Sequence, residues 1–237
     1  VDLDVLKKNK IILTNTPNAV RRPVAVASLT MILSLSAKLM IKDKLLREGR
    51  WNERTNHMGV GLTNKTLGLI GFGGIGKEFV TISKHLFKKI ICYDPFVYKE
   101  EMTNLQVDKV DFKEIASSSD FLVILCDLNE KTRGMIDSSF LNKMKRSSYL
   151  INLSRGPVVK EKDLIVSLKQ NKIAGAGLDV MTNEPIEKNN ELINLKNTIL
   201  TPHSLCWTDE CFDSIAKEAI CSILNYFNKK NILNRVI

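Results

Sequence analysis

The sequence has few aromatic side chains and no cluster of like charges, although it is basic. Aromatic residues make up 6% of the 237 positions, and the formal net charge of +9 comes from lysines and arginines scattered without a block of five or more. Nucleic-acid-binding surfaces combine a basic patch with interleaved aromatics or a recognisable motif. We therefore expect no nucleic acid among the partners of this chain.

Cysteines are few, and their spacing fits neither a disulfide framework nor a metal site. The five cysteines include Cys206 and Cys211, which have four residues between them, but no cluster of His or Cys elsewhere completes a set of zinc ligands. Buried, reduced thiols are the simpler interpretation. We accordingly expect a cytoplasmic protein with no bound metal.

No apolar segment is long enough without interruption to cross a membrane. The longest, Val24 to Ile41, contains Lys38 and four hydroxyl side chains, which is typical of a buried helix. No signal peptide or internal repeat is visible. The sequence therefore predicts a globular chain that has no membrane as a partner.

Apolar runs alternate with helix-like segments from Leu67 onward, which is typical of a parallel sheet covered on both faces. The sequence thus predicts the α/β class, with a Rossmann-type doubly wound parallel sheet and helices on both faces. The expected strands are Leu67–Gly71, Ile90–Tyr93, Phe121–Leu125, Tyr149–Leu153, Ile173–Leu178 and Thr198–Leu200, with a weaker one near Val107–Val110. The expected helices between them include Lys77–Phe87, Phe112–Ser117, Phe140–Met144 and Glu161–Lys169.

The segments on either side of this alternation are also expected to be helical. Pro23 suits the first turn of one long helix over Val24–Leu46, and Gly49 is placed to end it before a polar loop, Trp51–Gly61. Asp209–Lys229 has the pattern of an amphipathic helix. Its inner side is expected to hold Phe212, Ile215, Ala219, Ile223 and Phe227, and a short helix and a brief strand, Lys10–Thr14, are expected before residue 18.

A Gly-x-Gly-x-x-Gly turn joins the first expected strand to its helix. Gly71 permits the tight turn, Gly73 lets the backbone approach a pyrophosphate, and Gly76 lets the helix pack close to the strand. The pyrophosphate would bind the free N–H groups at the start of the helix. Because glycine-rich turns also occur in ordinary loops, the pattern acquires weight only from its context.

Asp94 supplies that context. It ends the second apolar run, close to the expected interval of about 20 residues after the turn. A carboxylate there accepts hydrogen bonds from the adenosine ribose hydroxyls and repels a ribose 2′-phosphate, so the position favours NAD over NADP. A turn aspartate before Pro95 is the alternative interpretation.

Chemically useful residues follow the main strands of the expected sheet. Ligands of open parallel sheets bind beyond the carboxyl ends of the strands. Six strand ends carry suitable residues, namely Gly71, Asp94, Cys126, Arg155, Asp179 and His203. This repetition is the strongest indication of a functional site that the residues themselves provide.

The residues that follow the later strands are suited to binding a carboxylate and transferring a proton. Arg155 offers a planar fork of donors that can hold a carboxylate and polarise an adjacent carbonyl. His203 follows a proline at a strand end, and with a carboxylate such as Glu184 or Asp179 to orient it, it suits proton transfer. An ordinary surface arginine and a structural histidine are the alternatives.

Five segments together resemble the D-isomer-specific 2-hydroxyacid dehydrogenases. Their joint order covers nearly the whole chain and is far more specific than any one of them. The segments are Thr66–Gly76, Thr132–Ile136, Ile151–Gly156, Gly177–Val180 continuing to Glu184-Pro185, and Thr201–His203 with Trp207-Thr208. The resemblance implies an NAD-dependent oxidoreductase that interconverts a small D-2-hydroxy acid and its 2-keto acid, like glyoxylate or hydroxypyruvate reductases and phosphoglycerate dehydrogenases.

The same resemblance implies a role for each site residue. Arg155, Glu184 and His203 form the catalytic trio, in which His203, paired with Glu184, gives or takes the proton while hydride passes between the nicotinamide and the acid. The implied cofactor contacts are Gly71, Gly73, Gly74, Ile75 and Gly76 for the pyrophosphate, Asp94 for the adenosine ribose, Asp179 for the nicotinamide carboxamide, and Cys126, Leu153, Ser154, Arg155 and His203 along the rest of the site.

The family also implies a domain organisation. Residues 1–18 resemble the tail of a substrate domain, 19–205 the NAD-binding domain with a dimerisation helix and loop over 24–61, and 206–237 a C-terminal helix that returns to the substrate domain. The apolar side of that helix is therefore expected to be exposed here. A homodimer acting on a small 2-hydroxy or 2-keto acid is expected, and a non-catalytic NAD(H)-binding sensor of the corepressor kind or an inactive fragment are the alternatives.

Overall fold

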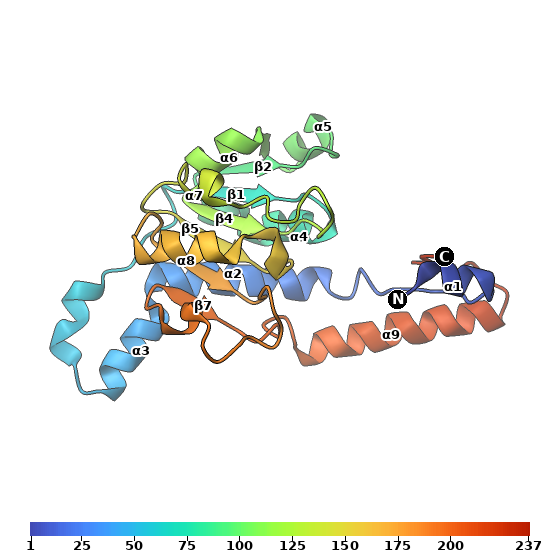
Figure 1. Ribbon diagram of the computed structural model, residues 1–237. Helices are drawn as coiled ribbons and strands as arrows, with labels where there is room; N and C mark the ends of the chain where they lie inside the picture. Colours follow the sequence, from blue (N-terminus) through green and yellow to red (C-terminus); the bar gives the residue numbers. More distant parts are fainter.

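The computed structural model describes residues 1–237 as one parallel sheet with helices on both faces and a helical extension (Figure 1). The seven strands have the order β3-β2-β1-β4-β5-β6-β7, so the winding direction changes between β1 and β4. This arrangement confirms the predicted doubly wound sheet. The strands are β1 (Thr66–Ile70), β2 (Lys89–Tyr93), β3 (Asp108–Lys109), β4 (Phe121–Ile124), β5 (Tyr149–Asn152), β6 (Gly175–Leu178) and β7 (Thr198–Leu200).

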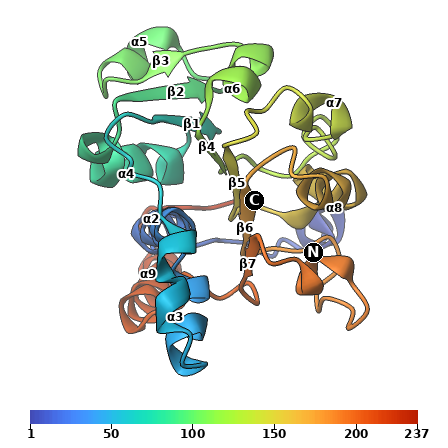
Figure 2. The same cartoon turned by 90° about the vertical axis from the view of Figure 1, so that its left-hand side faces the viewer.

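Helices cover both faces of this sheet (Figure 2). One face carries α2 (Arg21–Ala37) and α4 (Gly74–Ser83), and the other carries α6 (Phe112–Ser118), α7 (Ser138–Leu141) and α8 (Glu161–Lys169). Shorter helical pieces connect the strands. They are α5 (Lys99–Thr103), η2 (Lys84–Leu86), η3 (Gly156–Val158) and η4 (Glu191–Asn194).

The core consists of one apolar cluster on each face of the sheet, with 21 and 20 buried residues. Side chains of a strand point alternately to the two faces. In β4, Phe121 and Val123 accordingly belong to the cluster under α2 and α4, whereas Leu122 and Ile124 belong to the cluster under α6 to α8. Burial on both faces explains why these strands are continuous apolar runs in the sequence.

The single long helix expected over Val24–Leu46 is wrong, because the structure has two helices there. α2 ends at Ala37 and α3 (Leu39–Arg47) begins after Lys38, whose φ of 52° is left-handed, and the two helices are bent by 57°. No single helix is long and apolar enough to span a membrane, although α2 and α3 together would meet that criterion. The segment expected to be a loop after α3 contains a 3-10 helix, η1 (Trp51–His57).

The two chain ends form an extension beside the sheet, which contains α1 (Leu3–Lys8) and α9 (Asp209–Phe227) (Figure 1). The strand expected over Lys10–Thr14 is wrong, since only Thr14 forms a bridge, with Arg235. In α9 only Cys211 and Ser222 are buried. The exposed apolar surface predicted for this helix is confirmed, since most of its large apolar side chains are exposed, among them Phe212, Ile220, Ile223, Leu224 and Phe227.

Phe79 tests how far stability depends on the packing of α4 against the sheet. Its ring is fully buried in the cluster shared with α2, so Phe79→Ala should lower the free energy of unfolding by about 3–5 kcal/mol. Phe96 is 79% exposed, and Phe96→Ala should change it by less than about 0.5 kcal/mol. Urea denaturation followed by circular dichroism measures both values, and equal losses would contradict the packing described here.

Candidate functional site

The glycine turn lies at the point where the sheet changes its winding direction, between β1 and the start of α4. Gly71 has a φ of +102°, and a Cβ on it would lie 2.7 Å from the backbone nitrogen of Cys126. A Cβ on Gly76 would lie 2.6 Å from the carbonyl oxygen of Gly71. Both positions therefore require glycine, one for the tight turn and the other for the close approach of helix and strand.

Gly73 differs from these two because a Cβ on it would meet no atom within 4 Å. At this point α4 begins without a side-chain cap and without an acidic residue in its first turn. The free N–H groups at the positive end of the helix are thus available to an anion. These residues fit the pyrophosphate of NAD, which supplies both acceptor oxygens and negative charge.

Asp94 follows β2 and touches the glycine turn. Its Oδ2 accepts a hydrogen bond from the backbone N–H of Phe72 at 2.8 Å, and its Oδ1 accepts one from Phe96 at 2.9 Å. The carboxylate therefore does hold a turn, as the alternative interpretation supposed. Each oxygen keeps a further acceptor position, so the same group can also bind a ribose hydroxyl.

The residues between the turn and the later strand ends form a neutral wall. Cys126 follows β4, and burial raises the pKa of its thiol to about 11. The thiol is therefore uncharged at neutral pH. Leu153 and Ser154 follow β5 and are buried, and the hydroxyl of Ser154 donates to Oδ1 of Asn152 at 3.1 Å.

Asn152, the last residue of β5, fixes the turn that carries Arg155. Its Nδ2 donates to the carbonyl oxygen of Arg155 at 3.0 Å, and its Oδ1 accepts from the backbone N–H of Ser154 at 3.0 Å. Arg155 itself is exposed, and its Nη1 donates to the Ser154 carbonyl at 2.7 Å. The positioning role of Asn152 was not predicted from the sequence. The available signal was the presence of a polar residue inside an otherwise apolar strand.

Gly156 brings the loop after β5 directly against the loop after β6. A Cβ on Gly156 would lie 2.0 Å from the backbone carbon and oxygen of Met181. No side chain fits between these two backbones. This contact fixes Arg155 relative to the segment that holds Glu184. It was also not predicted from the sequence.

Glu184 and His203 come together from the loops after β6 and β7. The Nδ1 of His203 lies 2.8 Å from Oε2 of Glu184, and Oε1 of Glu184 accepts from the backbone N–H of Met181 at 2.9 Å. Burial raises the pKa of Glu184, but the hydrogen bonds from His203 and Met181 and the charges of His203 and Arg155 outweigh it, so the pKa lies below its ordinary value. The predicted pair is therefore formed, with an ionised carboxylate on the imidazole.

Asp179 is buried and holds the loop that carries His203. Its Oδ1 accepts hydrogen bonds from Oγ1 of Thr201 at 2.6 Å and from the backbone N–H groups of Ser204 at 3.1 Å and Leu205 at 3.2 Å. Its Oδ2 has only a longer bond from Leu205, at 3.3 Å. Sequence reasoning anticipated a cofactor contact for Asp179 but missed this positioning role.

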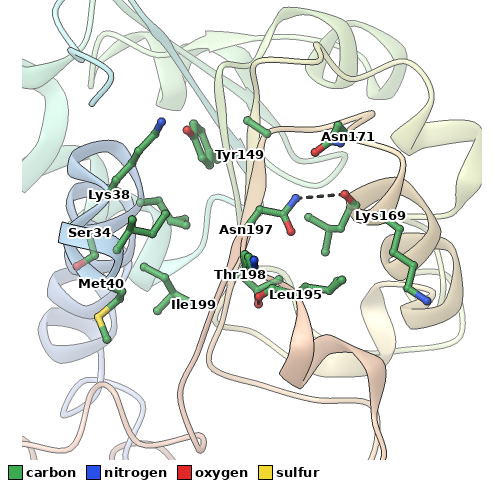
Figure 3. Close-up of a pocket in the computed structure, with 15 residues that line it drawn as sticks. Ser34, Lys38, Met40, Tyr149, Lys169, Asn171, Leu195, Asn197, Thr198 and Ile199 are labelled. Atoms are coloured by element: carbon green, nitrogen blue, oxygen red, sulfur yellow. Dashed lines mark hydrogen bonds between the residues drawn. The ribbon is translucent and has the colours of Figure 1, made fainter. Parts of the chain in front are cut away.

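A cavity of about 540 Å³ lies away from these residues (Figure 3). It opens between the α2–α3 bend, where Ser34 and Met40 line it, and the edge of the sheet. Tyr149 and Thr198, which also line it, are the first residues of β5 and β7, so the cavity lies at the amino ends of the strands. We place the functional site at the opposite, carboxyl ends, where the glycine turn and the polar side chains converge.

Known proteins resemble this chain over most of its length. Residues 29–204 match the family described as D-isomer specific 2-hydroxyacid dehydrogenase, NAD binding domain. The glyoxylate reductase of Thermococcus litoralis is 35% identical, over 98% of this chain and 71% of that protein. The D-3-phosphoglycerate dehydrogenase of Archaeoglobus fulgidus is 33% identical over 89% of this chain, but the chain spans only 40% of its length.

A solved structure agrees with these sequence relatives. The D-lactate dehydrogenase of Aquifex aeolicus, complexed with NAD and lactic acid, has a TM-score of 0.90 at 27% identity, and the match covers 100% of this chain and 76% of that one. The family match spans the glycine turn, Asp94, Arg155, Glu184 and His203. The chain therefore belongs to the D-isomer specific 2-hydroxyacid dehydrogenases and contains their NAD-binding domain.

Proposed function

We propose that this chain is the cofactor-binding part of an NAD-dependent oxidoreductase that interconverts a small D-2-hydroxy acid and its 2-keto acid. The observation that carries the proposal is the 2.8 Å contact between His203 and Glu184 on the same edge of the sheet as the glycine turn. Relatives named glyoxylate reductase and D-3-phosphoglycerate dehydrogenase support a substrate of this class.

The side chains at the later strand ends suit this reaction. Bound NAD supplies or accepts the hydride. Arg155 can hold the carboxylate of the acid through two parallel hydrogen bonds and polarise the neighbouring carbonyl. His203 donates a proton to the carbonyl oxygen in reduction and removes it from the hydroxyl in oxidation, while Glu184 stabilises the imidazolium. Holding both reactants in place supplies much of the acceleration, since no covalent intermediate is needed.

The remaining site residues complete the proposed cofactor site. Asp94 binds the adenosine ribose, the N–H groups from Gly73 to Gly76 bind the pyrophosphate, and Asp179 uses its freer Oδ2 for the nicotinamide carboxamide. Cys126, together with Leu153 and Ser154, forms the wall between these points. The support for this assignment is the open space at Gly73 and the spare acceptor positions of the two aspartates.

The surroundings of the site enter the proposal as well. Residues 1–18 and 206–237 would pack against a substrate domain, which is supported by the exposed apolar side of α9. A homodimer would form through α2, α3 and η1. Exposed apolar residues support this contact, namely Leu39, Met40, Leu46, Trp51 and Met58. Five free cysteines are consistent with a reducing compartment such as the cytoplasm.

Turnover tests the catalytic part of the proposal. The chain, together with any residues that its reading frame encodes upstream of Val1, should consume NADH with glyoxylate, hydroxypyruvate or pyruvate. His203→Ala should lower kcat by about 10²–10⁴-fold and change the Kd for NADH by less than about twofold. The substitution removes the proton donor but leaves the N–H groups at the start of α4 that bind the pyrophosphate. His85 is exposed at the opposite end of the sheet, and His85→Ala should keep wild-type turnover. A protein that binds NADH but reduces none of these acids would contradict the enzyme proposal for them and favour a sensor.

Titration of Glu184 tests the pair. Carboxyl-carbon NMR should give Glu184 a pKa below its ordinary value, and His203→Ala should raise it, because the hydrogen bond is lost while burial remains. His85→Ala should leave it unchanged. Since the pKa is depressed in the folded state, the stabilisation by ionised Glu184 is present above the unfolded pKa and is lost as the pH falls through the folded pKa. The stability difference between wild type and Glu184→Gln should thus shrink below about pH 4. If the pKa of Glu184 is the same in His203→Ala as in wild type, the contact between the two side chains is contradicted.

Asp94→Asn tests the choice of cofactor, because it removes the charge while keeping a side-chain oxygen as acceptor. Wild type should bind NADH more tightly than NADPH, and the variant should reduce that preference by about tenfold, since repulsion of the 2′-phosphate is lost. Asp108 lies on β3 at the sheet edge and pairs with Lys89 at 3.1 Å. Asp108→Asn is the control and should leave the preference unchanged. Isothermal titration calorimetry gives both affinities, and an unaltered preference in Asp94→Asn would remove Asp94 from the ribose site.

A further inference from the structure

Arg21, the first residue of α2, lies over the glycine turn. A Cβ built on Gly74 would lie 2.4 Å from Nε and 2.9 Å from Cζ of Arg21. The guanidinium group therefore lies against the first residue of α4, a helix on which α2 packs closely along the same face of the sheet (Figure 2). Because Gly74 has no side chain, it leaves the space that the guanidinium occupies.

The charges around Arg21 favour an anion. No side chain of the protein pairs with its guanidinium, whereas its neighbour Arg22 binds Glu78 with an Nη1–Oε1 distance of 2.7 Å. Neither α2 nor α4 has an acidic residue in its first turn or a side-chain cap. The positive ends of two helices and an unpaired guanidinium thus meet at one place. The carboxylate in the adjoining turn, Asp94, already accepts hydrogen bonds from Phe72 and Phe96.

We infer that Arg21 is a cofactor-binding residue, whose guanidinium grips the pyrophosphate bound at the start of α4. Its planar fork of donors can take two phosphate oxygens while the N–H groups of α4 take others. The guanidinium reaches the phosphate from α2 because it lies beside Gly74, within the space next to those N–H groups. The inference rests on the proposed function only for the nature of the ligand, and it does not depend on Arg155, Glu184 or His203.

Ligands with and without phosphate test this role. In Arg21→Gln the Kd values for NADH and for ADP should rise about tenfold, because a charged hydrogen-bonding partner of the phosphates is lost. The Kd for adenosine, measured by its competition with NADH, should stay the same. Arg22→Gln is the matched control, and it should change all three values by less than about twofold because it removes only an exposed ion pair.

Two further measurements separate ligand binding from a structural role. The thermal unfolding temperature of Arg21→Gln without ligand should equal that of wild type, since the side chain is exposed and unpaired. The Kd of ADP should also rise less steeply with salt in this variant than in wild type. Unchanged binding of ADP and NADH in Arg21→Gln, or an equal loss for adenosine, would overturn the inference. A protein that binds NADH through Arg21 but shows no turnover would contradict the proposed enzyme alone.

Discussion

Parallel pairing obliges the chain to leave all seven strands at the same edge of the sheet. Gly71, Asp94, Arg155 and the loops with Glu184 and His203 meet there without any strong attraction between them. The free energy that holds them in place comes from elsewhere. All four residues of β4 and all four of β5 are buried, and apolar burial of this kind is the main favourable term in folding. The polar residues at this edge are thereby positioned by an apolar scaffold and not by attraction between themselves.

Buried polar groups then determine the shape of each loop. An unpaired carboxylate in the protein interior is costly, and Asp179 avoids this cost only if Thr201, Ser204 and Leu205 direct their donors toward it. The loop accordingly adopts a conformation in which His203 has a φ of 53°, which is unusual for a residue other than glycine. His203 is thus placed by a carboxylate that it does not touch. Glu184 meets an imidazole whose position is already fixed.

The sheet and most of the residues at its carboxyl edge could be predicted from the sequence. Buried parallel strands appear in the sequence as apolar runs, and the residue that follows each run is a candidate for the site. The break at Lys38 could not, since a left-handed lysine has no signal comparable to glycine or proline. Asn152 and Arg21 were missed for another reason. Their roles depend on contacts between segments, such as the packing of α2 on α4 that places Arg21 beside Gly74, and no local pattern encodes such a contact.

Position and strength are separate properties of the His203–Glu184 pair. Their side chains are 44% and 39% exposed, so water screens the interaction and weakens the effect of each charge on the other. Their geometry, by contrast, depends on buried Asp179 and on the contact of Gly156 with Met181, neither of which is screened. In the proposed enzyme, a substrate domain that covers this edge would exclude water and strengthen the electrostatic interactions without moving the groups. In that enzyme the NAD-binding domain would supply the orientation of the reacting groups, and closure of the site would supply the low dielectric constant in which that orientation becomes effective.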